Sequence, residues 1–319
     1  MPARFGLRSR PSHATEVGEG DSMAFPIHEL AALGTATCWA TTGIIASDAI
    51  RALGAFHFNL IRQVFVSLIL AGVVLASGTL ALPGWQSVAV LAVSGVVGIL
   101  LGDTLNFAAV GRLGPRRAGA VFALNAPMAA VLGWLVLGER LGGQAWAGIA
   151  LTIAGVALAI MGRPPSGAHR LEQVWGGLRL GVLFGLGAAL GQAAGALIAR
   201  PYMAGGLDPY VGSLIRVGAS GLAMGVVAAL PFAPHRPRQV SVKLLVLTAL
   251  TALIGLLLGM TLFLYALQGS QTGIIATLSA TSPVIILPLL WLRTGQRPSA
   301  TSWAGAALAV AGLALIFTR

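Results

Sequence analysis

The sequence predicts an all-α integral membrane protein with ten transmembrane helices, arranged as two inverted five-helix repeats. Three observations lead to this fold class. The 319-residue chain is 56% hydrophobic and only 9% charged, with a mean hydropathy of +0.87. Long apolar runs recur along the whole chain, and the second half repeats the first at a constant offset. Because soluble domains carry about 25% charged residues, this composition excludes a water-soluble globular protein.

Apolar runs between polar breaks give ten candidate helices, each close to the roughly 20 residues that cross a bilayer. A closed β-barrel would need alternating strands instead, whereas these runs are continuous and rich in Leu, Ala and Gly. The predicted spans are 29–47, 60–82, 86–110, 116–137 and 144–162 in the first half, and 176–199, 210–232, 242–267, 272–292 and 300–318 in the second.

An internal repeat with an offset of 157 residues relates the two halves. "GILLGDTL" (98–105) matches "GLLLGMTL" (255–262) at six of eight positions, and "WAGIALTIAGVAL" (146–158) matches "WAGAALAVAGLAL" (303–315) at nine of thirteen. Five crossings per repeat is an odd number, so the second copy should enter the membrane upside down relative to the first. Inverted repeats let two halves exchange conformations around a central site, and the pattern therefore predicts a transporter.

The segments "APMAAVLGWLVLGERLGGQAWAGIALTIAGVALAI" (126–160) and "SPVIILPLLWLRTGQRPSATSWAGAALAVAGLALIF" (282–317) carry a resemblance to a known family. They resemble the drug/metabolite transporter superfamily, specifically its EamA-type ten-helix members, although Gln296 replaces an acid that is frequent there. The resemblance implies transport of amino acids and other metabolites without ATP. The expected organisation is a disordered tail (1–27), a first repeat (28–162), a linker (163–174) and a second repeat (175–319).

Asp103 is the one acid among nine that lies well inside a predicted span. Burying a carboxylate at membrane depth costs about 2.5–3.5 kcal/mol, so Asp103 should face protein or a water-filled cavity. There it could couple transport to protons or hold a substrate amine. The alternative is a structural role, in which a protonated Asp103 hydrogen-bonds a neighbouring helix. Its repeat mate is Met260, so the acid breaks the pseudo-symmetry, and this favours a functional role.

Other polar and aromatic side chains could complete a site around Asp103. Asn106 lies one turn later on the same helix face, and Asn125 could extend this polar patch. Tyr265 follows the repeat mate of Asn106 closely and suggests an aromatic wall. Trp39 and Gln192 interrupt the first and sixth helices. The predicted substrate contacts are Asp103, Asn106, Asn125, Tyr265, Thr281, Ser282, Trp39 and Gln192.

Prolines and glycines predict the helix geometry. Pro127 and Pro283 cannot donate a backbone hydrogen bond, so each frees a carbonyl one turn earlier. The resulting kinks could line the pathway or simply bend the helices. Two GxxxG pairs allow close helix approach, which we expect between equivalent helices around a pseudo-twofold axis. These pairs are Gly98 with Gly102, and Gly255 with Gly259.

Basic side chains invite two interpretations. Arg62 and Arg216 share an "LIR" context near the predicted starts of the second and seventh helices. They could attract a carboxylate-bearing substrate, but the favoured interpretation is that they extend to lipid headgroups. Counting connections, twelve Lys and Arg, including Arg116 and Arg117, lie opposite the termini and six lie beside them. This count predicts external termini, whereas the resemblance implies cytoplasmic ones.

These features predict a secondary active transporter, an exporter of amino acids or similar small metabolites by alternating access, with Asp103 as a proton-coupling candidate. The alternatives are a non-transporting scaffold or assembly protein, or a uniporter or importer. No cofactor, metal site or enzyme activity is expected, because Cys38 is the single cysteine and the histidines are scattered. The expected partners are a small-molecule metabolite and membrane lipid, not nucleic acid. We expect a monomer or weak dimer in the bacterial inner membrane.

Overall fold

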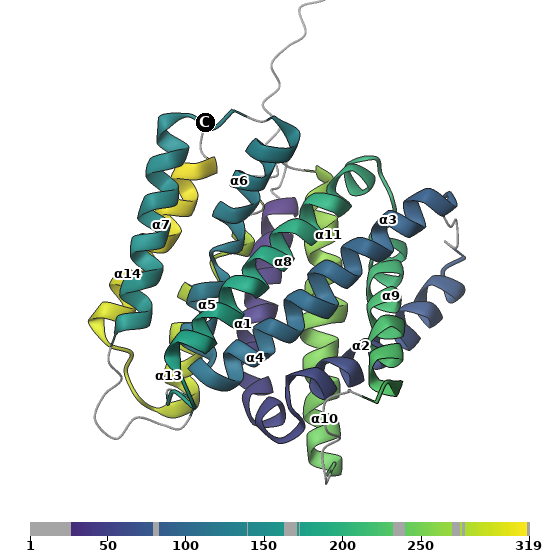
Figure 1. Cartoon of the computed structure of the whole chain (residues 1–319), viewed down its shortest axis with the longest axis horizontal. Helices are drawn as coiled ribbons and strands as arrows, with labels where there is room; N and C mark the ends of the chain where they lie inside the picture. The colour runs from purple at the N-terminus through teal and green to yellow at the C-terminus, as the bar shows by residue number, and fades with distance from the viewer. Residues whose placement is uncertain are drawn as a thin grey trace, which may run out of the picture.

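Figure 1 shows the computed structural model of the chain, which describes residues 27–78, 83–138, 140–162, 171, 173–231, 240–269, 275 and 278–317. All secondary structure in these ranges is helical. Almost all of the predicted tail (1–27) and most of the predicted linker (163–174) lie outside the described residues, as does Glu139.

Eight segments in the described part are long and apolar enough to cross a membrane, and two shorter apolar helices follow them. The all-helical membrane fold is therefore confirmed, with boundaries that differ by several residues. The first repeat contains α1 (Ile27–Leu53), α2 (Ala55–Ala76), a third span made of α3 (Trp85–Gly95), the π-helix η1 (Val96–Asp103) and α4 (Thr104–Leu113), a fourth made of α5 (Pro115–Phe122) and α6 (Asn125–Leu137), and α7 (Gly143–Met161).

The second repeat has the same order of elements. It contains α8 (Leu178–Ala204), α9 (Pro209–Ala229), an eighth span made of α10 (Val242–Thr251), the π-helix η3 (Ala252–Leu258) and α11 (Gly259–Gly269), and the shorter α13 (Ser282–Thr294) and α14 (Ala300–Phe317). The two π-helices occupy equivalent places in the third span of each repeat. The N-terminal part of the predicted helix 272–292 falls largely outside the described residues.

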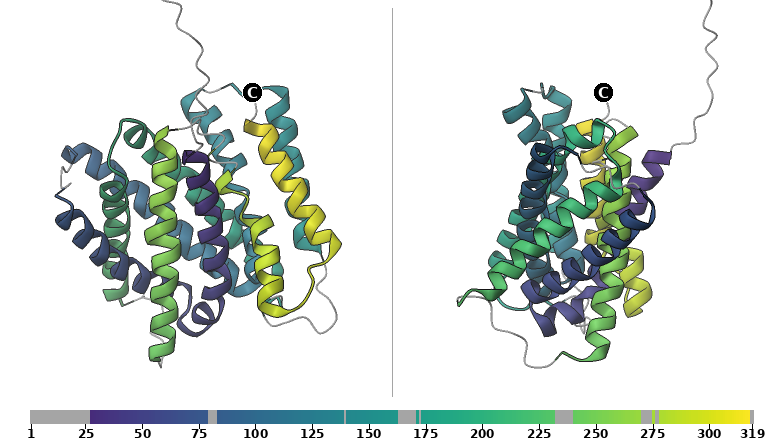
Figure 2. Two further views of the ribbon diagram at one scale, coloured as in Figure 1. Left: turned by 180° about the vertical axis from the view of Figure 1, so that it is seen from behind. Right: turned by 90° about the vertical axis from the view of Figure 1, so that its right-hand side faces the viewer.

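The first helix of each repeat packs within the other repeat. α1 contacts η3, α11 and α13, and α8 makes the reciprocal contacts with η1, α4 and α6. Figure 2 shows α1, in purple, beside the light-green helix formed by α10 and α11. The other close pairs between the repeats include two that join equivalent helices, α2 with α9 and α7 with α14. Contacts that are reciprocal in this way are what a pseudo-twofold axis produces.

Helices α7 and α14 lie side by side (Figure 1), and glycines bring their backbones together. A Cβ atom built on Gly148 would lie 2.6 Å from the Gly312 carbonyl oxygen, and one built on Gly155 would lie 2.7 Å from that of Gly305. Residue numbers rise along one helix as they fall along the other, so α7 and α14 run antiparallel. Gly148 and Gly305 are repeat mates, as are Gly155 and Gly312.

The predicted GxxxG pairs also permit close approach, but not between equivalent helices as expected. A Cβ atom on Gly98 would lie 3.4 Å from Gly195 Cα in α8, and one on Gly255 would lie 2.5 Å from Thr42 Oγ1 in α1. The remaining members of the pairs approach the same two helices: Gly102 faces Gly191, and Gly259 faces Cys38. Each pair therefore joins the third span of one repeat to the first helix of the other, which fixes the π-helices against α8 and α1.

The predicted proline kinks are helix breaks. A turn at 123–124 separates α5 from α6, and Pro127 is the third residue of α6. Pro283 likewise lies in the first turn of α13, after Thr281 at the N-cap. Proline is tolerated in the first turn because the backbone donor it lacks would be unpaired there in any case. The chain therefore begins a new helix at each proline instead of bending an existing one.

Arg116 and Arg117, which were counted among the connections, are buried, since both are about 5% exposed. Arg116 donates to the carbonyl oxygens of Ala159 at 2.8 Å and Gly162 at 3.3 Å, and Arg117 donates to that of Ile160 at 3.1 Å. These carbonyls end α7, where a helix presents unpaired acceptors and partial negative charge. The two arginines therefore close the end of α7, and they should not be counted in predicting orientation.

Candidate functional site

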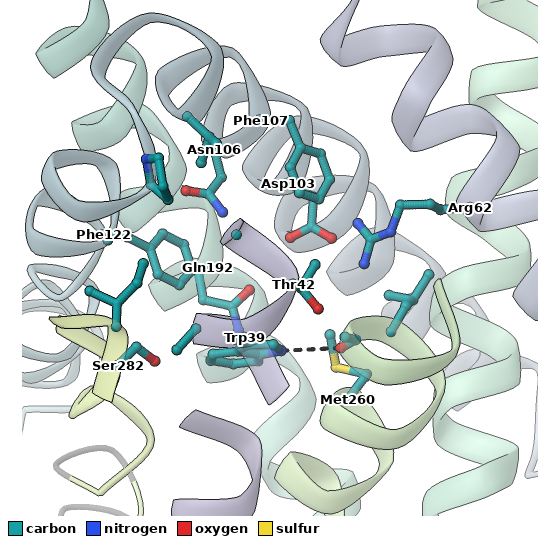
Figure 3. A pocket seen from close by; sticks show the side chains of 18 residues that line it. Trp39, Thr42, Arg62, Asp103, Asn106, Phe107, Phe122, Gln192, Met260 and Ser282 are labelled. Atoms are coloured by element: carbon teal, nitrogen blue, oxygen red, sulfur yellow. Dashed lines mark hydrogen bonds between the residues drawn. The ribbon is translucent and has the colours of Figure 1, made fainter. Parts of the chain in front are cut away.

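A cavity of about 60 Å³ lies where the two repeats meet. A water molecule needs about 10–15 Å³ of such space, so the cavity has room for a few waters or a small solute group. Its lining comes from α1, α2, η1, α4 and α5 of the first repeat, and from α8, η3, α11 and α13 of the second. Figure 3 labels the residues discussed below: Trp39, Thr42, Arg62, Asp103, Asn106, Phe107, Phe122, Gln192, Met260 and Ser282.

The structure brings five of the eight predicted substrate contacts into the lining of this cavity. They come from four different spans, and the residues are Trp39, Asp103, Asn106, Gln192 and Ser282. Asn125, Tyr265 and Thr281 are not among its lining residues. Residues that no sequence feature singled out also line the cavity, including Thr42, Phe107 and Phe122.

Asn125 and Thr281 satisfy backbone groups at the two helix breaks. The Asn125 side-chain amide donates to the Phe122 carbonyl oxygen at 2.7 Å, and the Thr281 hydroxyl donates to that of Leu278 at 2.7 Å. Each bond therefore reaches the carbonyl three residues earlier, at the equivalent break in its repeat. Because buried carbonyls require a partner, these side chains have a structural task. Tyr265 stacks on His28, with ring centroids 4.8 Å apart.

Asp103 ends the π-helix η1 at the point where α4 begins. Its carboxylate points toward the Arg62 guanidinium across the cavity (Figure 3), and it interacts electrostatically with both Arg62 and Arg216. Among the described residues it makes no hydrogen bond and no ion pair within 4.0 Å. The acid therefore lies near two cations without forming an ion pair with either one.

Arg62 is buried, with only 2% of its surface exposed. Its Nη2 donates to the Thr251 carbonyl oxygen at 3.2 Å, and its guanidinium lies 4.7 Å from the centre of the Phe107 ring. Nε and Nη1 have no hydrogen-bond partner within the described part of the chain. Arg62 therefore presents charge and unused donors at the cavity wall.

Arg216 is the equivalent side chain of the second repeat and is fully buried. Its Nη1 donates weakly to Met260 Sδ at 3.5 Å, and its Nη2 lies 3.2 Å from a Cβ atom built on Gly98. In the same way, Arg62 Nη2 lies 3.1 Å from a Cβ atom built on Gly255, which is the repeat mate of Gly98. Each arginine thus lies against the π-helix of the opposite repeat.

The expectation that Arg62 and Arg216 extend to lipid headgroups is wrong. α2 begins at Ala55, five residues earlier than predicted, so Arg62 is the eighth residue of its helix. Arg216 is likewise the eighth residue of α9, which begins at Pro209. At 1.5 Å per residue, both lie about 10 Å along the helix axis. Their shared "LIR" context is the sequence signal that could have indicated a common internal role.

Two neutral donors complete the polar part of the wall. Gln192 Nε2 and Thr42 Oγ1 are buried and have no hydrogen-bond partner within the described ranges. Trp39 Nε1 is already used, since it donates to the Gly255 carbonyl oxygen at 3.2 Å. The Trp39 ring contacts Phe122 edge-on, with centroids 6.1 Å apart. The cavity therefore has an apolar aromatic side and a side with unused hydrogen-bond donors.

The residues that the structure describes contain no group of three or more His, Cys, Asp or Glu side chains that could hold a metal ion. The chemistry available in the cavity is instead that of two guanidinium groups, one carboxylate and several neutral polar groups. Such a set of groups suits a small polar solute.

Comparisons with known proteins agree with this architecture. A protein of known crystal structure matches the fold with a TM-score of 0.66 at 20% sequence identity, over 90% of this chain and 95% of that chain. No curated protein sequence gives a significant match. The model of the EamA-like transporter family matches twice, at residues 27–161 and 179–318, which correspond to the two repeats. The chain is therefore a multi-pass membrane protein that belongs to the EamA-like transporter family.

Proposed function

We propose that this protein is a secondary active transporter that exports amino acids or similar small metabolites across a bacterial cytoplasmic membrane. The observation that carries the proposal is the polar cavity at the junction of the two repeats, lined by buried charged and polar side chains from both. Ionisable side chains within membrane spans are costly and usually mark a substrate or ion pathway. A scaffold protein would have no need for them at such a junction.

The proposed mechanism is alternating access between two inverted repeats. The antiparallel contact of α7 with α14 supports inversion, because these helices are equivalent in the two repeats. The reciprocal packing of α1 and α8 supports a pseudo-twofold axis through the cavity. In such an arrangement the two halves can exchange conformations and open the central site to either side.

Asp103 is the proposed site of proton coupling. The charged groups that face it are Arg62 on α2 and Arg216 on α9, while α1 and α8 contribute neutral side chains. Trp39, Asn106, Gln192 and Ser282 would contact the solute.

The test is flux into and out of proteoliposomes that contain the purified full-length protein. A panel of radiolabelled amino acids is supplied with and without a proton gradient. We expect at least one solute to accumulate only with the gradient. Asp103→Asn should abolish accumulation, whereas exchange of labelled for unlabelled solute should continue at a reduced rate. Asp208→Asn is the matched control, because Asp208 caps α9 and is not among the cavity-lining residues.

The alternatives give different results in the same assay. A uniporter would equilibrate a solute without accumulating it, and an importer would accumulate it in the opposite vesicle orientation. Absence of flux for the whole panel, with protein that is folded and inserted, would favour the scaffold.

A further inference from the structure

The charges around the cavity do not balance. Arg62 and Arg216 are 2% and 0% exposed, and both interact with the single carboxylate of Asp103. Arg62 and Asp103 line the cavity, Arg216 lies behind Met260, and the other lining side chains are neutral. Counted as charged groups, two cations and one anion leave an excess of one positive charge. A buried charge without a partner is strongly unfavourable, so the site is suited to a ligand that supplies one negative charge.

The cavity wall also has more hydrogen-bond donors than acceptors to pair with them. Arg62 has two nitrogen atoms without a partner in the described residues, Nε and Nη1, and Arg216 has two, Nε and Nη2. Gln192 adds Nε2, also without a partner. Arginine donates from a planar fork and never accepts. A ligand that satisfies this wall must therefore bring acceptors, which a carboxylate does with two oxygen atoms in matching geometry.

We infer that the cavity is a binding site for a small monocarboxylate group, with Arg62 as its direct ligand and Arg216 as a second cation behind Met260. The inference rests on the proposed transport function and specifies its substrate: the solute must carry a carboxylate. A monoanion neutralises the excess charge, whereas a dianion such as phosphate would reverse its sign. Cations and solutes without a carboxylate leave it uncompensated.

Arg62 and Arg216 have different access to the cavity. Arg62 lines it directly, whereas Arg216 is covered by Met260, whose sulfur atom lies 3.5 Å from Arg216 Nη1. Methionine is flexible and changes rotamer easily, so a small movement of Met260 would expose the second guanidinium to the same solute group. Phe107 packs against Arg62, with its ring centre 4.7 Å from the guanidinium carbon.

The test uses purified full-length protein and three probes of nearly equal size: acetate, acetamide and methylammonium. Thermal unfolding is followed at constant ionic strength with sodium sulfate as the balancing salt, because a dianion would reverse the sign of the excess charge. A ligand that binds only the folded state raises the midpoint with concentration. We expect acetate to raise the unfolding midpoint at concentrations about tenfold lower than acetamide does. Methylammonium should not change the midpoint.

Variants test whether the shift in unfolding midpoint comes from binding in the cavity. Arg62→Gln should remove the preference for acetate over acetamide, and Arg216→Gln should weaken it. Arg179→Gln is the control, because Arg179 is exposed at the start of α8. Should the buried arginine variants not fold, Asp103→Asn provides the second test: it raises the excess charge to two, so acetate should bind more tightly. Equal effects of acetate and acetamide on the wild-type protein, or weaker acetate binding by Asp103→Asn, would overturn the inference.

These experiments distinguish failure of the carboxylate-site inference from failure of the transport proposal. Acetate binding that depends on Arg62, with no flux of any solute, would keep the anion site and reject the transporter. If flux occurs, the methyl ester of the transported amino acid is the deciding probe. An ester transported as well as the acid would keep the transporter and reject the carboxylate site.

Discussion

A single methyl group at Gly155 should weaken the packing of the two repeats. The Cβ atom of Gly155→Ala would lie 2.7 Å from the Gly305 carbonyl oxygen, whereas ordinary contact begins at 3.4 Å. The backbones of α7 and α14 would therefore have to separate by at least about 0.7 Å, and by more to clear the Ala309 backbone nitrogen, which lies closer still. A gap of this size forfeits roughly a quarter to a half of the dispersion energy of each contact. We expect a loss of about 1–3 kcal/mol, as in other overpacked interiors.

The assay is thermal unfolding of the purified protein in detergent, compared with Gly72→Ala. Gly72 is also helical, but a Cβ atom there meets nothing within 4 Å. Alanine is the better helix former by about 1 kcal/mol, so Gly72→Ala should be neutral or stabilising. Gly155→Ala should lower the midpoint clearly. Equal midpoints for the two variants would refute the reasoning that backbone contact between α7 and α14 holds the repeats together.

Three further predictions concern local structure. Arg117→Gln should lower the unfolding midpoint, since charged hydrogen bonds to the end of α7 are worth about 1.5–3 kcal/mol, whereas Arg179→Gln should not. Asp208→Ala should cost about 1 kcal/mol, because Asp208 Oδ1 accepts from the backbone of Tyr210 at 2.8 Å; Asp208→Ser should recover most of it. Cys38 is 8% exposed, so N-ethylmaleimide should label it much more slowly in native protein than in unfolded protein.

The sequence predicted the helical architecture well because that information is local. Continuous apolar runs report on membrane crossing wherever they occur, and the 157-residue offset links the two halves without any knowledge of contacts. The lengths of the helices were harder to predict. Helix α2 begins five residues before its apolar run suggests. The reason is that Gly54, with φ of 76°, makes a one-residue turn directly after α1.

The site could be predicted only in part. Asp103 was conspicuous because one carboxylate in an apolar run is costly wherever it points. Arg62 and Arg216 were misread, because an arginine near a predicted helix end looks the same whether it faces lipid or protein. What decides their position is contact with distant segments, such as that between Arg62 and Thr251, 189 residues apart. Asn125 was misleading for the converse reason: its polar group is used by a neighbouring carbonyl.

The difference between Asp103 and Met260 suggests how a bound anion could be released. These residues are repeat mates, and Met260 now covers Arg216. If the repeats exchange conformations as proposed, Asp103 would come to lie against Arg62 as Met260 lies against Arg216. A carboxylate in that position would pair with Arg62 and displace the carboxylate of the solute.

The variant Asp103→Met removes this competing carboxylate. We expect it to bind acetate at least as tightly as the wild-type protein, because the excess positive charge grows from one to two. Its rate of exchange should nevertheless be lower than that of the wild-type protein for the same labelled amino acid, because nothing displaces the solute from Arg62. Met260→Asp should bind acetate less tightly, since an acid beside Arg216 cancels the excess charge. Exchange by Asp103→Met at the wild-type rate would show that Asp103 does not compete with the solute for Arg62.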